Sequence, residues 1–128
     1  MPPYTPPPPP SPPPPGAVDT LPPIIIVLEP PEIAILHQPL TIQAIIVDDQ
    51  RVASAQLVYR QTKKSKWNIL QMTDSDGDSI YQATIPASAV KKPKVEYYLI
   101  ARDAAGNTSV DPADAPNDAY EVEVEPFH

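Results

Sequence analysis

The chain has 128 residues, a formal net charge of −7 and no cysteine, and 21 of its residues are proline. Without cysteine it has no disulfide scaffold, thiolate zinc site, iron–sulfur cluster or cysteine nucleophile. The acidic balance argues against nucleic-acid binding, which needs clustered cations. The longest apolar run has five residues, whereas a membrane-spanning helix needs ~20. No basic segment follows Met1, so we expect neither membrane insertion nor a signal peptide.

The first 23 residues carry 13 of the prolines. Because proline fixes φ and donates no backbone hydrogen bond, residues 2–15 are expected to form an extended polyproline II rod. This segment serves either as a spacer from something upstream or as a ligand for an SH3-type or EVH1-type groove. It lacks the flanking Arg or Lys that would orient it in an acidic SH3 groove. We therefore divide the chain into a proline-rich linker, residues 1–23, and one folded domain, residues 24–128, and read Met1 as a truncated start of a longer protein.

From residue 24 onward, apolar and polar residues alternate, as in strands that turn one face to a core. Turns rich in Asp, Gly, Asn, Pro and Lys separate these segments. The pattern predicts seven strands, at residues 24–28, 40–48, 54–60, 66–72, 79–85, 94–103 and 119–125. Pro30 and Pro31 are expected to break the first strand, which suits an edge position, and to pass residues 33–36 to the other sheet. Seven short strands favour an all-β, Greek-key sandwich.

Three segments occur in a characteristic order and spacing: SAQLVYR at residues 54–60, YQATIP at 81–86 and VEYYLIARDAAGN at 95–107. Together they resemble the Ig-like, fibronectin-III-like modules of bacterial envelope and secreted proteins, and the resemblance covers about residues 24–125. It implies a seven-stranded Ig-like sandwich that acts as a spacer or binding domain in the cell envelope, the periplasm included, or outside the cell. It brings no catalytic residue. The chain departs from antibody domains, which carry a Cys…Trp…Cys set, and its tryptophan, Trp67, stands on the fourth expected strand.

No residue set points to catalysis. The two histidines are His37, in an expected turn, and His128, the last residue, and neither has Ser or Asp at a motif spacing. Three glycines in all make no phosphate-binding loop. The chain is therefore expected to be no enzyme and to need no cofactor. Asn107-Thr108-Ser109 matches a glycosylation sequon, which matters only in a eukaryotic secretory route.

The strand at residues 94–103 supplies candidate binding residues. Its alternation places Tyr97 in the core, either as a tyrosine corner whose hydroxyl bonds the backbone or as plain packing. Tyr98, Ile100 and Trp67, with Tyr59 as a further neighbour, are expected to form an exposed apolar patch that binds a protein or polysaccharide partner. A carbohydrate-binding module would need aromatic side chains in a row, for which Trp67, Tyr98 and Tyr120 are available.

Charge is expected to divide between two poles, because successive strands run in opposite directions and their turns alternate between two ends. Six of the nine cations fall in turns at one pole: Lys63, Lys64, Lys66, Lys91, Lys92 and Lys94. Nine of the sixteen acids fall in turns at the other: Asp48, Asp49, Asp74, Asp76, Asp78, Asp103, Asp111, Asp114 and Asp118. Four of them are expected to converge, either as a calcium site or as turn-capping residues: Asp49, Asp74, Asp76 and Asp103. Residues 74–78, DSDGD, resemble a calcium loop but lack its twelve-residue span and closing Glu.

These observations predict a non-catalytic spacer or binding module of a larger envelope or secreted protein, presented on a proline-rich stalk. Two alternatives stay open: a carbohydrate-binding accessory module, and an adaptor recognised through its polyproline run.

Overall fold

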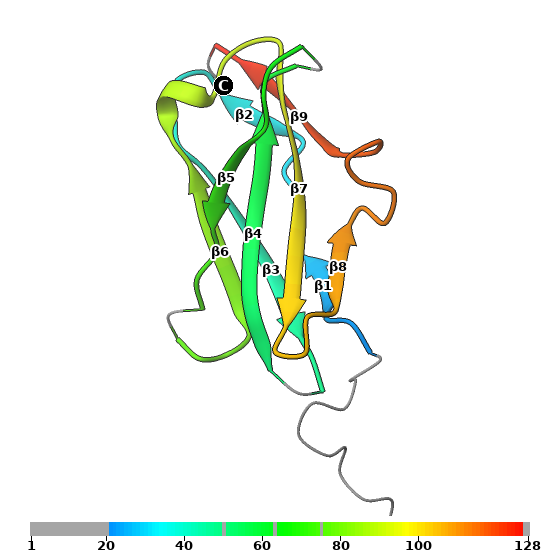
Figure 1. The fold of residues 1–128 in the computed structure, drawn as a ribbon. Coiled ribbons are helices and arrows are strands. Elements are labelled where there is room, and N and C mark those ends of the chain that lie inside the picture. Colours follow the sequence, from blue (N-terminus) through cyan, green and yellow to red (C-terminus); the bar gives the residue numbers. More distant parts are fainter. Residues whose placement is uncertain (1–20, 50, 63, 75, 127–128) are drawn as a thin grey trace, which may run out of the picture.

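A computed structural model gives the fold and describes residues 21–49, 51–62, 64–74 and 76–126 (Figure 1). The described residues form nine β-strands and one short 3-10 helix, η1 (Ala87–Ala89). The protein is all-β, as the sequence predicts. The polyproline prediction for residues 2–15 lies outside the described residues. No helix among the described residues is long and apolar enough to cross a membrane.

The strands form two sheets (Figure 1). The smaller sheet has the order β1-β3-β6 and consists of β1 (Ile24–Val27), β3 (Leu40–Val47) and β6 (Ile80–Ile85). The larger sheet has the order β2-β9-β7-β4-β5, with β8 also paired to β7. Its strands are β2 (Ile33–Ile35), β4 (Val52–Arg60), β5 (Asn68–Gln71), β7 (Lys94–Asp103), β8 (Thr108–Asp111) and β9 (Tyr120–Glu125).

The first strand passes from one sheet to the other, as predicted. β1 pairs antiparallel with β3, whereas β2 pairs parallel with β9 and places Ala34 opposite Val124. Pro30 and Pro31 stand between the two strands. Because proline donates no backbone hydrogen bond, the chain leaves the first ladder at this point and joins the second.

The prediction of seven strands missed one strand, β8, and counted β2 as part of the first strand. β8 lacks the run of alternating apolar residues that marks a strand, and its pairing with β7 holds it in place. This pairing sets Asp111 opposite Leu99, in the middle of β7. Asp111 is therefore carried away from the pole at which the sequence places it, and the acidic pole is smaller than predicted.

Side chains from both sheets build one core. Its members alternate along the strands, and the largest fully buried ones are Tyr97, Ile42, Ile46, Leu57 and Ile85. The inward positions expected for the odd residues of β7 are confirmed, because Tyr97, Leu99 and Ala101 are all fully buried. Alternate burial of this kind joins the two sheets face to face.

Tyr97 packs within the core and makes no tyrosine corner. Its ring stacks on the ring of Tyr120, with centroids 5.0 Å apart and an interplanar angle of 19°. Its hydroxyl has no hydrogen-bond partner among the described residues. The corner prediction is therefore wrong, and core packing is what the structure supports.

Most connections between strands lie at one of the two ends of the molecule, as expected, whereas the β8–β9 connection lies at its side (Figure 1). The chain enters β1 at the end where the β3–β4, β5–β6 and β7–β8 connections lie, which we call the acidic pole. The β4–β5 connection, η1 and the end of β9 lie at the opposite end, the basic pole (Figure 1). Exposed Asp49 and Asp76 belong to the first pole, and exposed Lys64, Lys66 and Lys92 to the second.

Candidate functional site

The three predicted binding residues lie on one surface, the outer face of the larger sheet, which is turned away from the core. Tyr98 and Ile100 occupy successive outward positions of β7 and are half-buried. Trp67 precedes β5 and meets Tyr98 edge-on, with ring centroids 5.0 Å apart and an interplanar angle of 81°. That these residues bind a partner stays a prediction.

The outer face continues across the neighbouring strands. Register places Val58 of β4 between Tyr98 of β7 and Ile69 of β5. Val58 is almost fully buried there, while Ile69 is 59% exposed. The prediction that Tyr59 is a further neighbour of the patch is wrong, because its side chain points to the opposite face of the sheet and belongs to the core.

A cation packs on the tryptophan. The guanidinium carbon of Arg60 lies 4.0 Å from the centroid of the Trp67 ring. Attraction between a cation and the face of an aromatic ring contributes about 0.5–2 kcal/mol, the more as the pair is desolvated. Trp67 is therefore held from two sides, by Arg60 and by Tyr98, and both rings have defined positions on the outer face.

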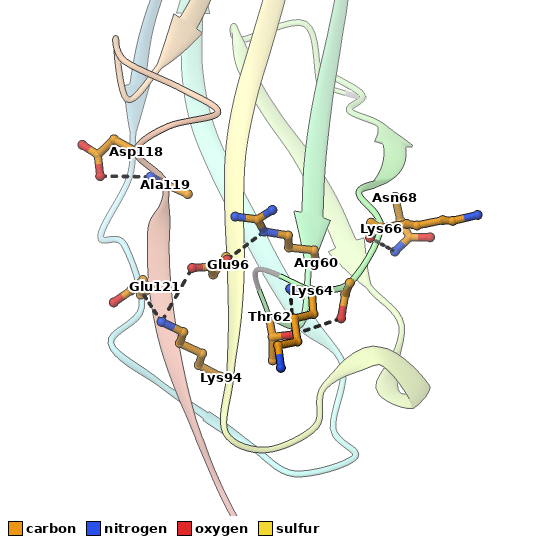
Figure 2. A network of polar contacts seen from close by, with 11 residues as sticks. Arg60, Thr62, Lys64, Lys66, Asn68, Lys94, Glu96, Asp118, Ala119 and Glu121 are labelled. Carbon is orange, nitrogen blue, oxygen red and sulfur yellow. Dashed lines mark hydrogen bonds and ion pairs between the residues drawn. The ribbon is translucent and has the colours of Figure 1, made fainter.

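Arg60 belongs to an ion network that crosses three strands (Figure 2). Its Nε donates to Oε1 of Glu96 at 2.8 Å. Lys94 Nζ lies 3.6 Å from the second Glu96 oxygen and donates to Glu121 Oε1 at 2.6 Å. The Glu96 side chain is only 4% exposed, and the cost of burying a charge is offset where oppositely charged partners such as Arg60 and Lys94 surround it.

The same network affects Lys94. The hydrogen bond to Glu121 is the main reason that the pKa of Lys94 is raised; burial opposes the rise, and the charges of Glu121 and Glu96 add to it. The ammonium form is thus favoured in the folded protein. The four charges alternate across the sheet in the order Glu121, Lys94, Glu96, Arg60.

A polar groove adjoins this network, and we call it the Arg60 groove. Its volume is about 470 Å³. The β8–β9 connection forms one wall and β4 and β7 another, with the lining residues Arg60, Glu96, Pro116, Asn117, Asp118, Ala119, Tyr120 and Glu121. Sequence reasoning missed this groove and the Arg60–Glu96 pair, because no spacing within one segment indicates either.

Tyr120 does not complete an aromatic row with Trp67 and Tyr98. Its ring stacks on Tyr97 towards the core, and its hydroxyl donates to Asp111 Oδ2 at 2.7 Å. Burial raises the pKa of both tyrosines; at Tyr120 the hydrogen bond to Asp111 adds to it, and at Tyr97 the Tyr120 hydroxyl adds to it. The predicted row is therefore wrong.

Two aspartates near the acidic pole accept hydrogen bonds from backbone N–H groups of turns. Asp74 accepts hydrogen bonds from the N–H groups of Asp78 at 3.1 Å and Ser79 at 2.8 Å. Asp103 is buried and accepts from the N–H groups of Ala105 and Asn107 and from the Asn107 side chain, at 2.8–3.0 Å. These are turn-capping contacts.

The calcium site predicted at Asp49, Asp74, Asp76 and Asp103 gains no support from this geometry. No group of three or more His, Cys, Asp or Glu in the described parts of the chain is arranged to hold a metal ion. The site stays a prediction, and turn capping is the role that the hydrogen bonds support. His37 lies exposed in the β2–β3 turn at φ 61°, and His128 lies outside the described residues.

Comparison with known proteins adds no family. No family model matches the chain, and a search of curated proteins finds no match. The resemblance to bacterial Ig-like modules therefore stays a prediction carried by the three sequence segments.

Proposed function

We propose that this chain is a non-catalytic, Ig-like module that spaces and presents a binding surface within a larger envelope or secreted protein. The observation that carries the proposal is the placement of the two ends: the described chain enters at the acidic pole and leaves β9 at the basic pole (Figure 1). A module joined at opposite poles adds its own length between its neighbours.

The pairing of the strands supports an Ig-like, Greek-key identity. In Ig-like domains strands A, B and E face strands G, F, C and, in variable types, C′. Here β1, β3 and β6 take the places of strands A, B and E. In the other sheet β9, β7, β4 and β5 take the places of G, F, C and C′. The extra strand β8 adds to the second sheet without changing that order.

The last residues of the linker contact the sandwich, which supports the proposal that the linker acts as a stalk. Pro23 is buried, and its carbonyl accepts a hydrogen bond from the Ser109 hydroxyl of β8. A stiff segment transmits direction only if its last residues are held by the domain. Pro23 and Ser109 supply that hold at the acidic pole.

Pulsed spin-label distances test the spacer role. The chain has no cysteine, so introduced cysteines are labelled specifically. We expect Pro22→Cys with Pro126→Cys to give a separation of about 30 Å or more, since the longest strands rise ~3.3 Å per residue. The control pair at one pole, Pro22→Cys with Ala105→Cys, should give a clearly shorter distance. Equal distances for the two pairs would contradict the proposal that the module is a spacer.

One observation favours a second function, carbohydrate binding: the polar Arg60 groove lies beside the Trp67–Tyr98 pair. The adaptor alternative depends on residues 1–15, which lie outside the described residues, and it stays a prediction from the sequence.

A further inference from the structure

We propose that the Arg60 groove is a binding site for a neutral saccharide. The inference rests on the proposed function in one respect, namely that the outer face of the larger sheet is the surface this module presents. It assigns the contact to Arg60, Asn117 and Asp118, which lie beside the aromatic pair.

The size and lining of the groove suit a small polyhydroxylated ligand. Its volume of about 470 Å³ lies within the ~300–1,000 Å³ range of small-molecule sites. Arg60 and the Asn117 amide can donate hydrogen bonds to a ligand, and the exposed carboxylate of Asp118 can accept them. A sugar hydroxyl both donates and accepts, so it can pair with either kind of group.

The charges around the groove disfavour anionic ligands. Of its lining residues, Arg60 is positively charged, and Glu96, Asp118 and Glu121 are negatively charged. Lys94 is not part of the lining and pairs with Glu96 and Glu121 from beside the groove. An anion would therefore meet an excess of carboxylates, whereas a neutral molecule can bind through hydrogen bonds without that repulsion.

Arg60 is oriented before any ligand arrives. Its Nε is bound to Glu96, its guanidinium packs on Trp67, and the side chain is only 16% exposed. Among the described residues its terminal nitrogens make no hydrogen bond, because the bond to Glu96 uses Nε. A planar donor held in place loses little rotamer freedom on binding.

The opposite wall offers an acceptor in a defined orientation. Asp118 Oδ1 accepts the N–H of Ala119 at 3.0 Å (Figure 2). This contact directs the carboxylate without burying it, because Asp118 is exposed. The groove thus has a hydrogen-bond donor on one wall, at Arg60, and an acceptor on the other, at Asp118. Sugar hydroxyls can pair with both.

Fluorescence of the full chain tests the site, since Trp67 is its one tryptophan and touches Arg60 directly. The probes are three neutral oligosaccharides (cellohexaose, maltohexaose and chitohexaose) and one anionic oligosaccharide, hexagalacturonic acid. We expect at least one neutral probe to change the Trp67 emission saturably, with a Kd of about 1 mM or below, and the anionic probe to leave it unchanged.

Two matched variants locate the binding. Asp118→Ala should weaken the neutral probe at least ~10-fold, which corresponds to about 1.4 kcal/mol. Asp114→Ala, an exposed carboxylate of the same connection outside the groove lining, should bind like the unchanged chain. Both variants should melt at the same temperature as the unchanged chain, so that a weakened affinity reports the site and not the fold.

Three results would overturn the proposal: no saturable change with any neutral probe up to about 10 mM, equal affinity in the two aspartate variants, or stronger binding of the anionic probe. None of these changes the pole-to-pole spin-label distance. A failed saccharide site and a failed spacer role are therefore distinguishable.

Discussion

The outer faces of the two sheets differ in which residues they bury. On the larger sheet Glu96, a carboxylate, is nearly inaccessible, with a side chain 4% exposed. On the smaller sheet Ile26, an aliphatic residue, is 53% exposed. Glu96 lies on β7, between β4 and β9, where Arg60 and Lys94 cover it, whereas Ile26 lies on the edge strand β1. Burial on an outer face is thus set by position in the sheet more than by hydropathy.

The smaller sheet's outer face is itself divided. Near the basic pole its residues pair by hydrogen bonds, Thr41 with Thr84 and Gln43 with Gln82. Near the acidic pole its outward residues are aliphatic: Ile24, Ile26, Ile45, Val47 and Ile80. β-branched residues favour strands on either face, so this half keeps its strand structure without a polar surface. The charged and aromatic groups that can recognise a ligand are on the larger sheet.

The largest expected effect checks the register of β7, on which this comparison depends. Tyr97→Ala should lower the free energy of unfolding by about 3–5 kcal/mol, because it removes a fully buried ring stacked on Tyr120. Tyr98→Ala, on the outer face, should cost about 1–2 kcal/mol. Denaturant titration measures both. The reverse order would mean that inside and outside are exchanged along β7.

The next effect measures the buried carboxylate. Glu96→Gln should destabilise by about 2–4 kcal/mol, because it removes the charge that Arg60 and Lys94 surround. Glu121→Gln, at the exposed end of the same network, should cost less than ~1 kcal/mol. Equal costs in thermal or denaturant unfolding would show that Glu96 is no more buried in solution than Glu121.

Alkaline pH should act mainly on the larger sheet, although burial and the charge of Asp74 also raise the pKa of Tyr81 on β6 of the smaller sheet. Burial raises the pKa of Tyr97 and Tyr120, and the hydrogen bond to Glu121 raises that of Lys94. A raised folded-state pKa stabilises the protein fully below the unfolded values, ~10 for Tyr and Lys, and that stability is lost as pH rises through the folded values. We expect the melting temperature to fall by about 5–10 °C from pH ~9 to ~11. Tyr97→Phe, whose hydroxyl has no described partner, should reduce this fall; an unchanged fall would contradict the assignment.

A smaller effect tests the aliphatic half of the smaller sheet. Ile26→Thr keeps a β-branched side chain at a half-exposed position, so we expect a change within about 0.5–1 kcal/mol. Ile42→Thr on the neighbouring strand, fully buried, should cost several times more. Similar losses in chemical denaturation would mean that the outer aliphatic half is covered in solution.

The smallest effect concerns the linker. Deleting residues 1–20 should leave the melting temperature within about 2 °C, because a proline-rich segment buries little apolar surface. Deleting residues 1–23 should cost more, since it also removes buried Pro23 and its contact with Ser109. A loss of many degrees with the shorter deletion would show that the proline-rich segment packs on the sandwich.

Several features of the fold follow from the sequence alone. Alternation along residues 94–103 predicts which side chains of β7 point inward, and Tyr97, Leu99 and Ala101 are buried accordingly. Pro30 and Pro31 predict the transfer of the first strand between sheets. Each of these depends on properties of one segment, namely side-chain period and the missing donor of proline.

The site depended on the tertiary structure. The pairing of Arg60 with Glu96, the inward turn of Tyr120 towards Asp111 and the groove along the β8–β9 connection join residues that lie 36, 9 and more than 50 positions apart. Alternation tells which face of a strand a residue occupies, but only the register between strands tells which residue lies beside it. Register is set by the packing of the whole sheet, so the contacts that make a binding surface are decided only when the strands assemble.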